Sequence, residues 1–415
     1  MSKIVFFCIP AHGHTNPTLG VVRELSARGH QVRYYSYESF REKIEEAGAE
    51  FISCDAYDAE LGLTPKDAEK IGKDIAFSTH ILVETTLALD HTVCEDMTKY
   101  RPDCIVADSM AIWGKAAALK LNIPFVSSTT TFAFNKYSAK IMKQSFGELL
   151  RMVFSMPKIN KDIKRLQSNG YPFRSMLDLM QSDPQTNTIV YTSPQFQPCA
   201  ETFPDTYAFV GPSVRPITAQ IAKPHEKIIY ISMGTVNNDM LPFYQNCIAA
   251  LEQTDYQAIL SVGELVDADA FRNLPENITV ARHVDQIAVL AQADVFLSHC
   301  GMNSVNESLY YCVPLIMYPQ TTEQGGVANR VAELDAGIFL ESGTGSNHTG
   351  YFSSADRNPV PSPAQIRSTV DKILQNDSYR QNASAISDGF RNCAGAEGAA
   401  EKILEVIAGC HTTEP

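Results

Sequence analysis

The sequence predicts an α/β protein built from two doubly wound domains with mostly parallel sheets, and three observations support this class. The chain has 415 residues, which is too long for one ordinary domain. Short apolar runs alternate with helical patterns in its first third, and the alternation restarts near residue 227. A stretch with six prolines, residues 194–224, separates the two series, and we interpret it as the domain connection.

The first series begins with the apolar run 3–9, which is typical of a strand buried on both faces. Pro17 then marks a helix start and Gly29 the end of that helix. Further strands are expected at 31–36, 103–107 and 123–127, further helices at 38–47 and 111–121, and mostly helical structure at 130–190. This strand–helix–strand order predicts a parallel sheet with helices on both faces.

The second series predicts six strands with helices between them, at 227–233, 257–262, 278–282, 294–299, 314–318 and 337–340. The last clear helical segment is 399–407. We expect domains at 1–212 and 213–395, with a C-terminal helix in 396–415 that packs back on the first domain. Two such units in series leave a cleft, and ligands of these sheets lie beyond the carboxyl ends of the strands.

Composition excludes several classes of protein. The formal net charge of −13 does not suit a general nucleic-acid binder. The N-terminus has one positive residue, Lys3, and a short apolar run, so we expect a core strand there and no signal peptide. No run reaches the roughly 18 apolar residues of a membrane span. The ten cysteines show no CxxC or zinc spacing, which favours reduced thiols in a cytoplasmic protein.

The strongest local pattern is a buried strand that ends in His299 and is followed by the turn and helix start 300–304. Gly301 allows close approach of a ligand to the backbone, and a helix start offers unpaired N–H groups, so this turn can bind an anion. An alternative remains open, because Ser304 and Glu307 have capping-box spacing and taken alone favour a simple helix cap. His299 can likewise be a structural histidine.

These residues resemble the nucleotide-sugar signature of the family-one glycosyltransferases. The matching elements are Gln286, the run 299–304, Glu307, Val313-Pro314, Pro319, Glu323-Gln324 and Asn329. The segments IPAHGHTNP (9–17) and YISMGT (230–235) resemble the first loop of the family and the opening of its second domain. The combination is most similar to the bacterial macrolide-type transferases. The resemblance implies the GT-B fold, two Rossmann-like domains facing across a cleft, with 1–212 binding the acceptor and 213–395 the donor.

The resemblance also implies roles for residues of the second domain. His299, the amides of Gly301 and Asn303 and the Ser304 hydroxyl would contact the donor diphosphate, and Thr235 would close that site. Glu307 would hold the ribose and so could not also complete the capping box. Gln286 would hold the nucleoside. Glu323 and Gln324 would bind the transferred sugar. His283 stands where plant members have a tryptophan that stacks on uracil, and Val284 is the residue that follows it. Met302 replaces a second tryptophan.

A second constellation pairs His14 with Asp108. Each follows a predicted strand, so both are expected at the same sheet edge. Transfer to a hydroxyl requires removal of its proton, an imidazole can accept that proton near neutral pH, and a carboxylate can fix its tautomer. The resemblance assigns the same roles, general base and partner. Alone, His14 is more simply a turn histidine bonded to its own loop; the pairing and the donor motif favour catalysis. His12 is expected to be structural.

These observations predict an inverting transferase that moves a hexose, first of all glucose, from a UDP-sugar to a hydroxyl of an apolar small molecule. A flavonoid, another phenol or a macrolide would suit. Candidate acceptor contacts are Trp113, Phe132 and Phe134, with Tyr137, Met142, Phe146, Met152, Phe154 and Met176 as further candidates, although such spacing also suits plain core. No metal or other cofactor is expected, because no HExxH, DxD or pair of cysteines suits a divalent site.

Two other classes remain as alternatives: a nucleotide-sugar-binding regulator without chemistry, and a sugar-nucleotide epimerase on a similar scaffold. Retention of both His14 and Asp108 argues against the regulator, because binding alone needs neither. A nicotinamide dehydrogenase is disfavoured, because no GxGxxG follows the first strand.

Overall fold

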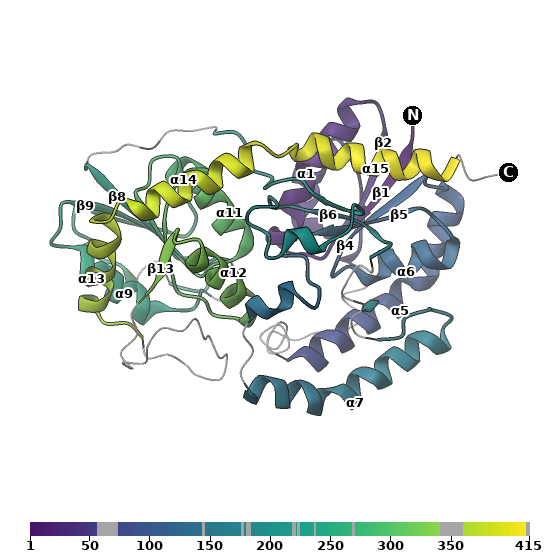
Figure 1. Ribbon diagram of the computed structural model, residues 1–415, viewed down its shortest axis with the longest axis horizontal. Helices are drawn as coiled ribbons and strands as arrows, with labels where there is room; N and C mark the ends of the chain where they lie inside the picture. The colour runs from purple at the N-terminus through teal and green to yellow at the C-terminus, as the bar shows by residue number, and fades with distance from the viewer. Residues whose placement is uncertain are drawn as a thin grey trace. The chain divides into compact units, whose positions relative to one another are not determined.

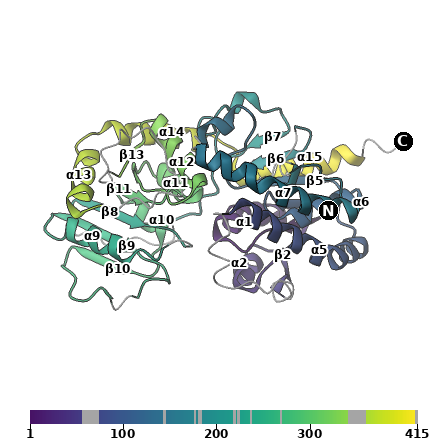
Figure 2. The same cartoon turned by 90° about the horizontal axis from the view of Figure 1, so that it is seen from below.

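The computed structural model describes residues 1–55, 74–142, 146–175, 178–179, 184–217, 221, 225–235, 238–267, 270–340 and 360–411. The chain divides into two compact units. The first contains Met1–Ser138, Phe146–Ser213 and Cys393–Pro415, and the second contains Ala139–Ser145 and Val214–Asn392. Each unit has its own parallel sheet with helices on both faces (Figures 1 and 2). The predicted fold class, two Rossmann-like α/β domains, is confirmed.

The sheet of the first unit has seven parallel strands in the order β3-β2-β1-β4-β5-β6-β7. They are β1 (Lys3–Phe7), β2 (Gln31–Ser36), β3 (Glu50–Ser53), β4 (Cys104–Asp108), β5 (Phe125–Thr129), β6 (Asn187–Val190) and β7 (Tyr207–Phe209). Strands β3, β6 and β7 were not anticipated. The strand order reverses between β1 and β4, which is where sheets of this kind bind ligands.

The proline-rich stretch 194–224 is not a connection over its whole length, and that interpretation is wrong for its first part. Strand β7 lies inside it and pairs with β6 at the edge of the sheet. Pro204 precedes β7 and its carbonyl accepts a hydrogen bond from Tyr207, so this proline belongs to the turn into an edge strand. The first unit continues to Ser213.

Helices of the first unit follow the strands. They are α1 (His12–Ala27), α2 (Arg41–Glu46), α5 (Ile75–Tyr100), α6 (Ile112–Leu121), α7 (Phe146–Ser168) and α15 (Gly395–His411), with short 3-10 turns at Glu38–Phe40, Ser138–Met142 and Ala200–Thr202. Helix α1 begins at His12, earlier than the start predicted at Pro17, which lies inside the helix. Ala11 is extended and its carbonyl accepts from the backbone of His14 and Thr15, so the helix begins before the proline.

The C-terminal helix α15 belongs to the core of the first unit. It packs against α1 (Figure 1). Its buried face, Ala399, Ala400, Ile403 and Ile407, joins the apolar cluster formed by β1 and β4. The backbone N–H of Gly395, at its start, donates to the carbonyl of Val210 at 2.7 Å.

The second unit repeats the same topology with six parallel strands in the order β10-β9-β8-β11-β12-β13. They are β8 (Lys227–Ser232), β9 (Tyr256–Ser261), β10 (Ile278–Ala281), β11 (Val295–Ser298), β12 (Leu315–Met317) and β13 (Gly337–Phe339). The helices are α9 (Leu241–Leu251), α10 (Gln286–Leu290), α11 (Met302–Tyr310), α12 (Thr322–Glu333), α13 (Pro363–Leu374) and α14 (Ser378–Arg391). The order reverses between β8 and β11. Within the described residues, no helix has both the length and the apolar character needed to cross a membrane.

Candidate active site

The first candidate site lies where the strand order of the first sheet reverses, at the carboxyl ends of β1 and β4. His14 stands in the first turn of α1, which follows β1, and Asp108 is the last residue of β4. Nδ1 of His14 lies 2.8 Å from Oδ2 of Asp108. The Asp108 side chain is fully buried, and that of His14 is 20% exposed. The expected contact between these two side chains is therefore present, although His14 is on a helix and not in a loop.

The contact determines which nitrogen of His14 is basic. An ionised carboxylate only accepts hydrogen bonds, so Nδ1 carries the hydrogen and the lone pair is on Nε2. Oδ1 of Asp108 accepts the backbone N–H of Met110 at 2.9 Å, which fixes the carboxylate in turn. His12, by contrast, places its ring against Phe40, with 4.9 Å between ring centroids.

Sequence reasoning missed Thr130. Its Oγ1 lies 3.1 Å from Nδ1 of His14, and the residue follows directly after β5, the strand next to β4. The available signal was its position, because a polar residue after a third neighbouring strand lies at the same sheet edge. Together Asp108 and Thr130 hold the imidazole from one side.

The candidate acceptor residues divide between the interior and the surface, where Tyr137 and Phe154 are exposed. Trp113 is 4% exposed within the core of the first unit, and its indole N–H has no hydrogen-bond partner among the described residues. Phe132 is buried against Phe196, with ring centroids 5.5 Å apart. Phe134 is half-buried. Met176 and the side chains of Met142 and Phe146 lie outside the described residues.

The second candidate site lies where the other sheet reverses, after β8 and β11. The half-buried ring of His299 packs between Gly234 and Gly301, and a Cβ added at either glycine would lie 2.6 Å from the ring. Gly234 also has a φ of +81°, which a residue with a side chain rarely adopts. Both glycines are therefore required by the close approach of the histidine.

His299 is neutral at physiological pH, because burial lowers its pKa to about 4. Its Nδ1 has no hydrogen-bond partner among the residues described. Buried polar nitrogens are nearly always paired in proteins. The two glycines face Nε2 of the same ring, so Nε2 is the nitrogen that can contact a ligand at the helix start.

Helix α11 begins at Met302, with Gly301 as an extended N-cap that supplies no side-chain hydrogen bond. The capping-box alternative is therefore wrong: Ser304 is the third residue of the helix and not its cap. The half-buried Asn303 and Ser304 lie in the first turn, where backbone N–H groups lack helical partners. Met302, in contrast, is buried.

The side chain of Glu307 pairs with Gln286. The side-chain amide of Gln286 donates to Oε2 of Glu307 and lies 3.4 Å from Oγ of Ser304. Burial raises the pKa of Glu307. Gln286, which was expected on the nucleoside, therefore has its amide directed at the residue expected on the ribose.

A further residue missed by sequence reasoning supports the turn after β8. The buried Asn238 donates from Nδ2 to the carbonyl of Gly234 at 2.9 Å. A Cβ at Gly263 would lie 1.9 Å from the same nitrogen. Thr235, the next residue after Gly234, is exposed. The asparagine thus fixes the glycine turn while leaving the threonine at the surface.

The remaining donor candidates lie at or near the surface. His283 is exposed, and its Nε2 lies 2.8 Å from Oε1 of Glu264. Val284 is half-buried. Glu323 is exposed in the first turn of α12, and Oε1 of Gln324 accepts the backbone N–H of Gln320 at 2.8 Å. The ring at the expected nucleobase position is therefore held by a carboxylate that sequence reasoning missed.

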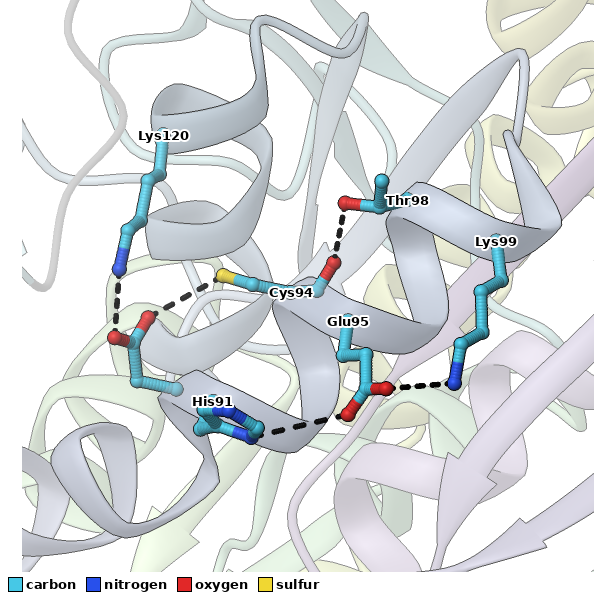
Figure 3. Close-up of a pocket in the computed structure, with 7 residues that line it drawn as sticks. His91, Cys94, Glu95, Thr98, Lys99 and Lys120 are labelled. Atoms are coloured by element: carbon cyan, nitrogen blue, oxygen red, sulfur yellow. Dashed lines mark hydrogen bonds and ion pairs between the residues drawn. The ribbon is translucent and has the colours of Figure 1, made fainter.

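An open surface pocket of about 450 Å³ lies elsewhere in the first unit, over α5 and α6 (Figure 3). Its polar groups are paired: Lys120 with Asp90, and Lys99 with Glu95. Burial and a hydrogen bond to Asp90 raise the pKa of Cys94 to about 11, so its thiol is a poor nucleophile. All ten cysteines lie in the described part of the chain, and none forms a disulfide.

Comparisons with known proteins agree on one family. The family described as "Erythromycin biosynthesis protein CIII-like, C-terminal domain" matches residues 245–403. The chain is 31% identical to "Uncharacterized UDP-glucosyltransferase YdhE" of Bacillus subtilis, covering 98% of this chain and 99% of that protein. It is 32% identical to "NDP-glycosyltransferase YjiC" of Bacillus licheniformis, covering 98% of each. It is 27% identical to "Demethyllactenocin mycarosyltransferase" of Streptomyces fradiae, covering 98% of this chain and 87% of that protein.

Solved structures show the same fold. The kitacinnamycin glycosyltransferase has a TM-score of 0.80 at 24% identity, and the calicheamicin glycosyltransferase CalG4 has 0.78 at 24%, with 98% of each chain covered in both cases. Fold, site and relatives together define a glycosyltransferase. The chain belongs to the family-one glycosyltransferases of the macrolide type, which have the GT-B fold.

Proposed function

We propose that this glycosyltransferase transfers a hexose, first of all glucose, from a UDP-sugar to a hydroxyl of an apolar small molecule, with inversion at the anomeric carbon. A flavonoid, another phenol or a macrolide is the proposed acceptor. The observation that carries the proposal is the contact of His14 Nδ1 with the buried Asp108 carboxylate. The relative named as a UDP-glucosyltransferase supports the donor, and the macrolide-type relatives support the acceptor class.

In the proposed reaction, Nε2 of His14 takes the proton of the acceptor hydroxyl as its oxygen attacks the anomeric carbon. The bond from that carbon to the diphosphate oxygen breaks, and UDP leaves with the electron pair from the opposite face. An α-linked donor thus gives a β-glycoside. Asp108 remains ionised and stabilises the imidazolium that forms. Trp113, Phe132 and Phe134 remain the proposed acceptor contacts.

On the donor side, Nε2 of His299, the backbone of Gly301 and Asn303 and the Ser304 hydroxyl would bind the diphosphate. Thr235 would close that site. Glu307 would bind the ribose, His283 and Val284 the base, and Glu323 and Gln324 the sugar. These groups can compensate the charge of the leaving diphosphate without a metal or another cofactor, and the proposed reaction uses none.

The test replaces the proposed base. General-base catalysis contributes about 100- to 10,000-fold, or about 2.7–5.5 kcal/mol, so we expect His14→Ala to lose kcat on that scale. UDP binding, measured by calorimetry, should persist. Turnover is followed by mass spectrometry with UDP-sugars and a panel of phenols and macrolides. His12→Ala is the matched control. His12 lies only two residues before His14, and its ring packs on Phe40.

Three outcomes would contradict the proposal. Near-normal turnover of weakly acidic alcohols by His14→Ala would remove the general base. UDP binding without glycoside formation for any acceptor would indicate a regulator. Conversion of the donor with no acceptor present would indicate an epimerase.

A further inference from the structure

A partly buried hydrogen-bonded chain in the second unit connects three elements and was not anticipated from the sequence. Tyr230 of β8 donates from its hydroxyl to Oε1 of Gln286 at 3.0 Å. Gln286, the first residue of α10, donates from Nε2 to Oε2 of Glu307 on α11. Tyr230 is 1% exposed, and its ring stacks on Phe296 with 4.6 Å between centroids. The phenol is therefore held rigidly at the start of the chain.

The order of donors in this chain fixes the orientation of the Gln286 amide. A carboxylate only accepts hydrogen bonds, so the NH₂ group must face Glu307. The amide oxygen then faces Tyr230, whose hydroxyl can donate to it. The opposite orientation would place the amide oxygen against the carboxylate and leave two acceptors in contact. Tyr230 thus selects the one orientation in which Gln286 can donate to Glu307.

The chain engages one oxygen of Glu307. Among the described residues, one hydrogen bond is given to this carboxylate, from Gln286 to Oε2, and no ion pair reaches it. Oε1 can therefore accept hydroxyl groups of a ligand. A carboxylate that accepts from two neighbouring hydroxyls distinguishes a ribose from a 2′-deoxyribose, which lacks one of them.

We propose that Tyr230 and Gln286 are positioning residues that orient Glu307 toward the donor sugar ring, and that this Tyr230–Gln286–Glu307 chain determines a preference for ribonucleoside over 2′-deoxyribonucleoside diphosphates. The inference rests on the proposed function, because it requires that Glu307 face the ribose of the donor. It assigns Gln286 a role through Glu307 in place of a direct contact with the nucleoside.

The test measures Kd by calorimetry for two probes, UDP and 2′-deoxy-UDP, with the full-length protein. A hydrogen bond to a charged group predicts that wild type prefers UDP by about 10- to 100-fold. Glu307→Ala should abolish the preference. Tyr230→Phe, which keeps the stacked ring, and Gln286→Leu should each reduce the preference by about 2- to 10-fold, mainly by weakening the binding of UDP. The double variant Tyr230→Phe/Glu307→Ala should show the same preference for UDP as Glu307→Ala alone, because the residues act in one chain.

Tyr256→Phe is the matched control. This tyrosine lies on β9 of the same unit, and its hydroxyl donates to Asp371 at 3.0 Å, outside the chain described above. We expect it to leave the ratio unchanged. The inference would be overturned if Tyr230→Phe and Gln286→Leu left the ratio of the two Kd values unchanged, which includes equal weakening of both probes. UDP binding by wild type would then still support the proposed function. Failure of wild type to bind UDP would overturn both.

Discussion

His14 can act as a base only if its Nε2 is unprotonated before the acceptor binds. Asp108 ensures this by accepting the Nδ1 hydrogen at 2.8 Å. The same carboxylate then faces a full positive charge after proton transfer. Because its side chain is fully buried, the interaction is weakly screened. One residue therefore both selects the tautomer and stabilises the product of the proton transfer.

Asp108→Asn tests this dual role at constant shape. The amide can present NH₂ to Nδ1, which moves the imidazole hydrogen to Nε2 and removes the base. We expect kcat to fall by about 100- to 10,000-fold with little change in UDP binding. Asp103→Asn is the control. Asp103 stands just before the first residue of β4, at the end opposite Asp108, and its Oδ2 accepts a hydrogen bond from the backbone N–H of Lys3 at 2.7 Å. Equal kcat in wild type and Asp108→Asn would exclude this function for the carboxylate.

His299, whose Nδ1 is inaccessible to solvent, predicts a pH effect on stability. Its pKa in the folded protein, about 4, is below the ordinary value of 6.5. Above pH 6.5 neither state is protonated; as pH falls toward 4, only the unfolded chain gains the proton, so stability decreases and then levels off below 4. The group accounts for about 3 kcal/mol across this window.

We therefore expect the unfolding free energy of His299→Gln, measured with urea, to depend less on pH between 6.5 and 4 than that of wild type. His91→Gln is the control, since that imidazole is 90% exposed. The same pH dependence in His299→Gln and wild type would show that the His299 ring is not responsible.

The candidate site was predictable where residues follow strands. His14, Asp108, His299 and Gly301 each stand after or at the end of a continuous apolar run, and parallel strands bring their carboxyl ends to one edge. Thr130 was missed because it is one of five consecutive hydroxyl residues, 127–131, and the run does not show which of them faces His14. Asn238 and Glu264 were missed because no local pattern marks them. The direction of the Gln286 amide depends on Tyr230, which is 56 residues away in the chain. Such contacts depend on tertiary packing and not on spacing.

At the scale of elements, strands with long apolar runs were predictable and short or polar ones were not. Strand β3 (Glu50–Ser53) buries one of its four residues and β7 (Tyr207–Phe209) has three residues, so neither has a clear periodicity. Pairing with β2 and β6 determines them. Helix starts were also uncertain, because Pro17 indicates a first turn but is tolerated inside α1.

The return of α15 to the first unit predicts a mutational effect. Ile403 is fully buried in that core, and truncation of a buried isoleucine costs about 2–5 kcal/mol. We expect Ile403→Ala to lower the unfolding free energy by that amount in urea titrations. Glu405→Ala, an exposed position on the same helix, should change it by less than about 0.5 kcal/mol. A change in Ile403→Ala as small as that of the control would show that α15 contributes little to this core.

For the whole molecule, the two units repeat one arrangement. In each, the candidate residues stand at the two strands where the sheet order reverses, β1 and β4 in one and β8 and β11 in the other. The chain carries a net charge of −13, yet the proposed donor has a diphosphate. Backbone amides and a helix start can bind that anion through local dipoles, so a favourable net charge is not required.

This leads to a prediction about metals. If amides and side chains stabilise the leaving UDP, extensive dialysis against EDTA should leave kcat within about twofold of the untreated enzyme, because no metal acts as Lewis acid. One group in the described part of the chain, His80, Glu84 and Asp162, could hold an ion, but Arg165 pairs with both of its carboxylates. A loss of activity that Mg²⁺ or Mn²⁺ restores would contradict the prediction. His80→Ala would then show whether this group is responsible. If the variant is active and insensitive to EDTA, the ion acts at this group. If the variant remains sensitive to EDTA, the ion acts with the donor.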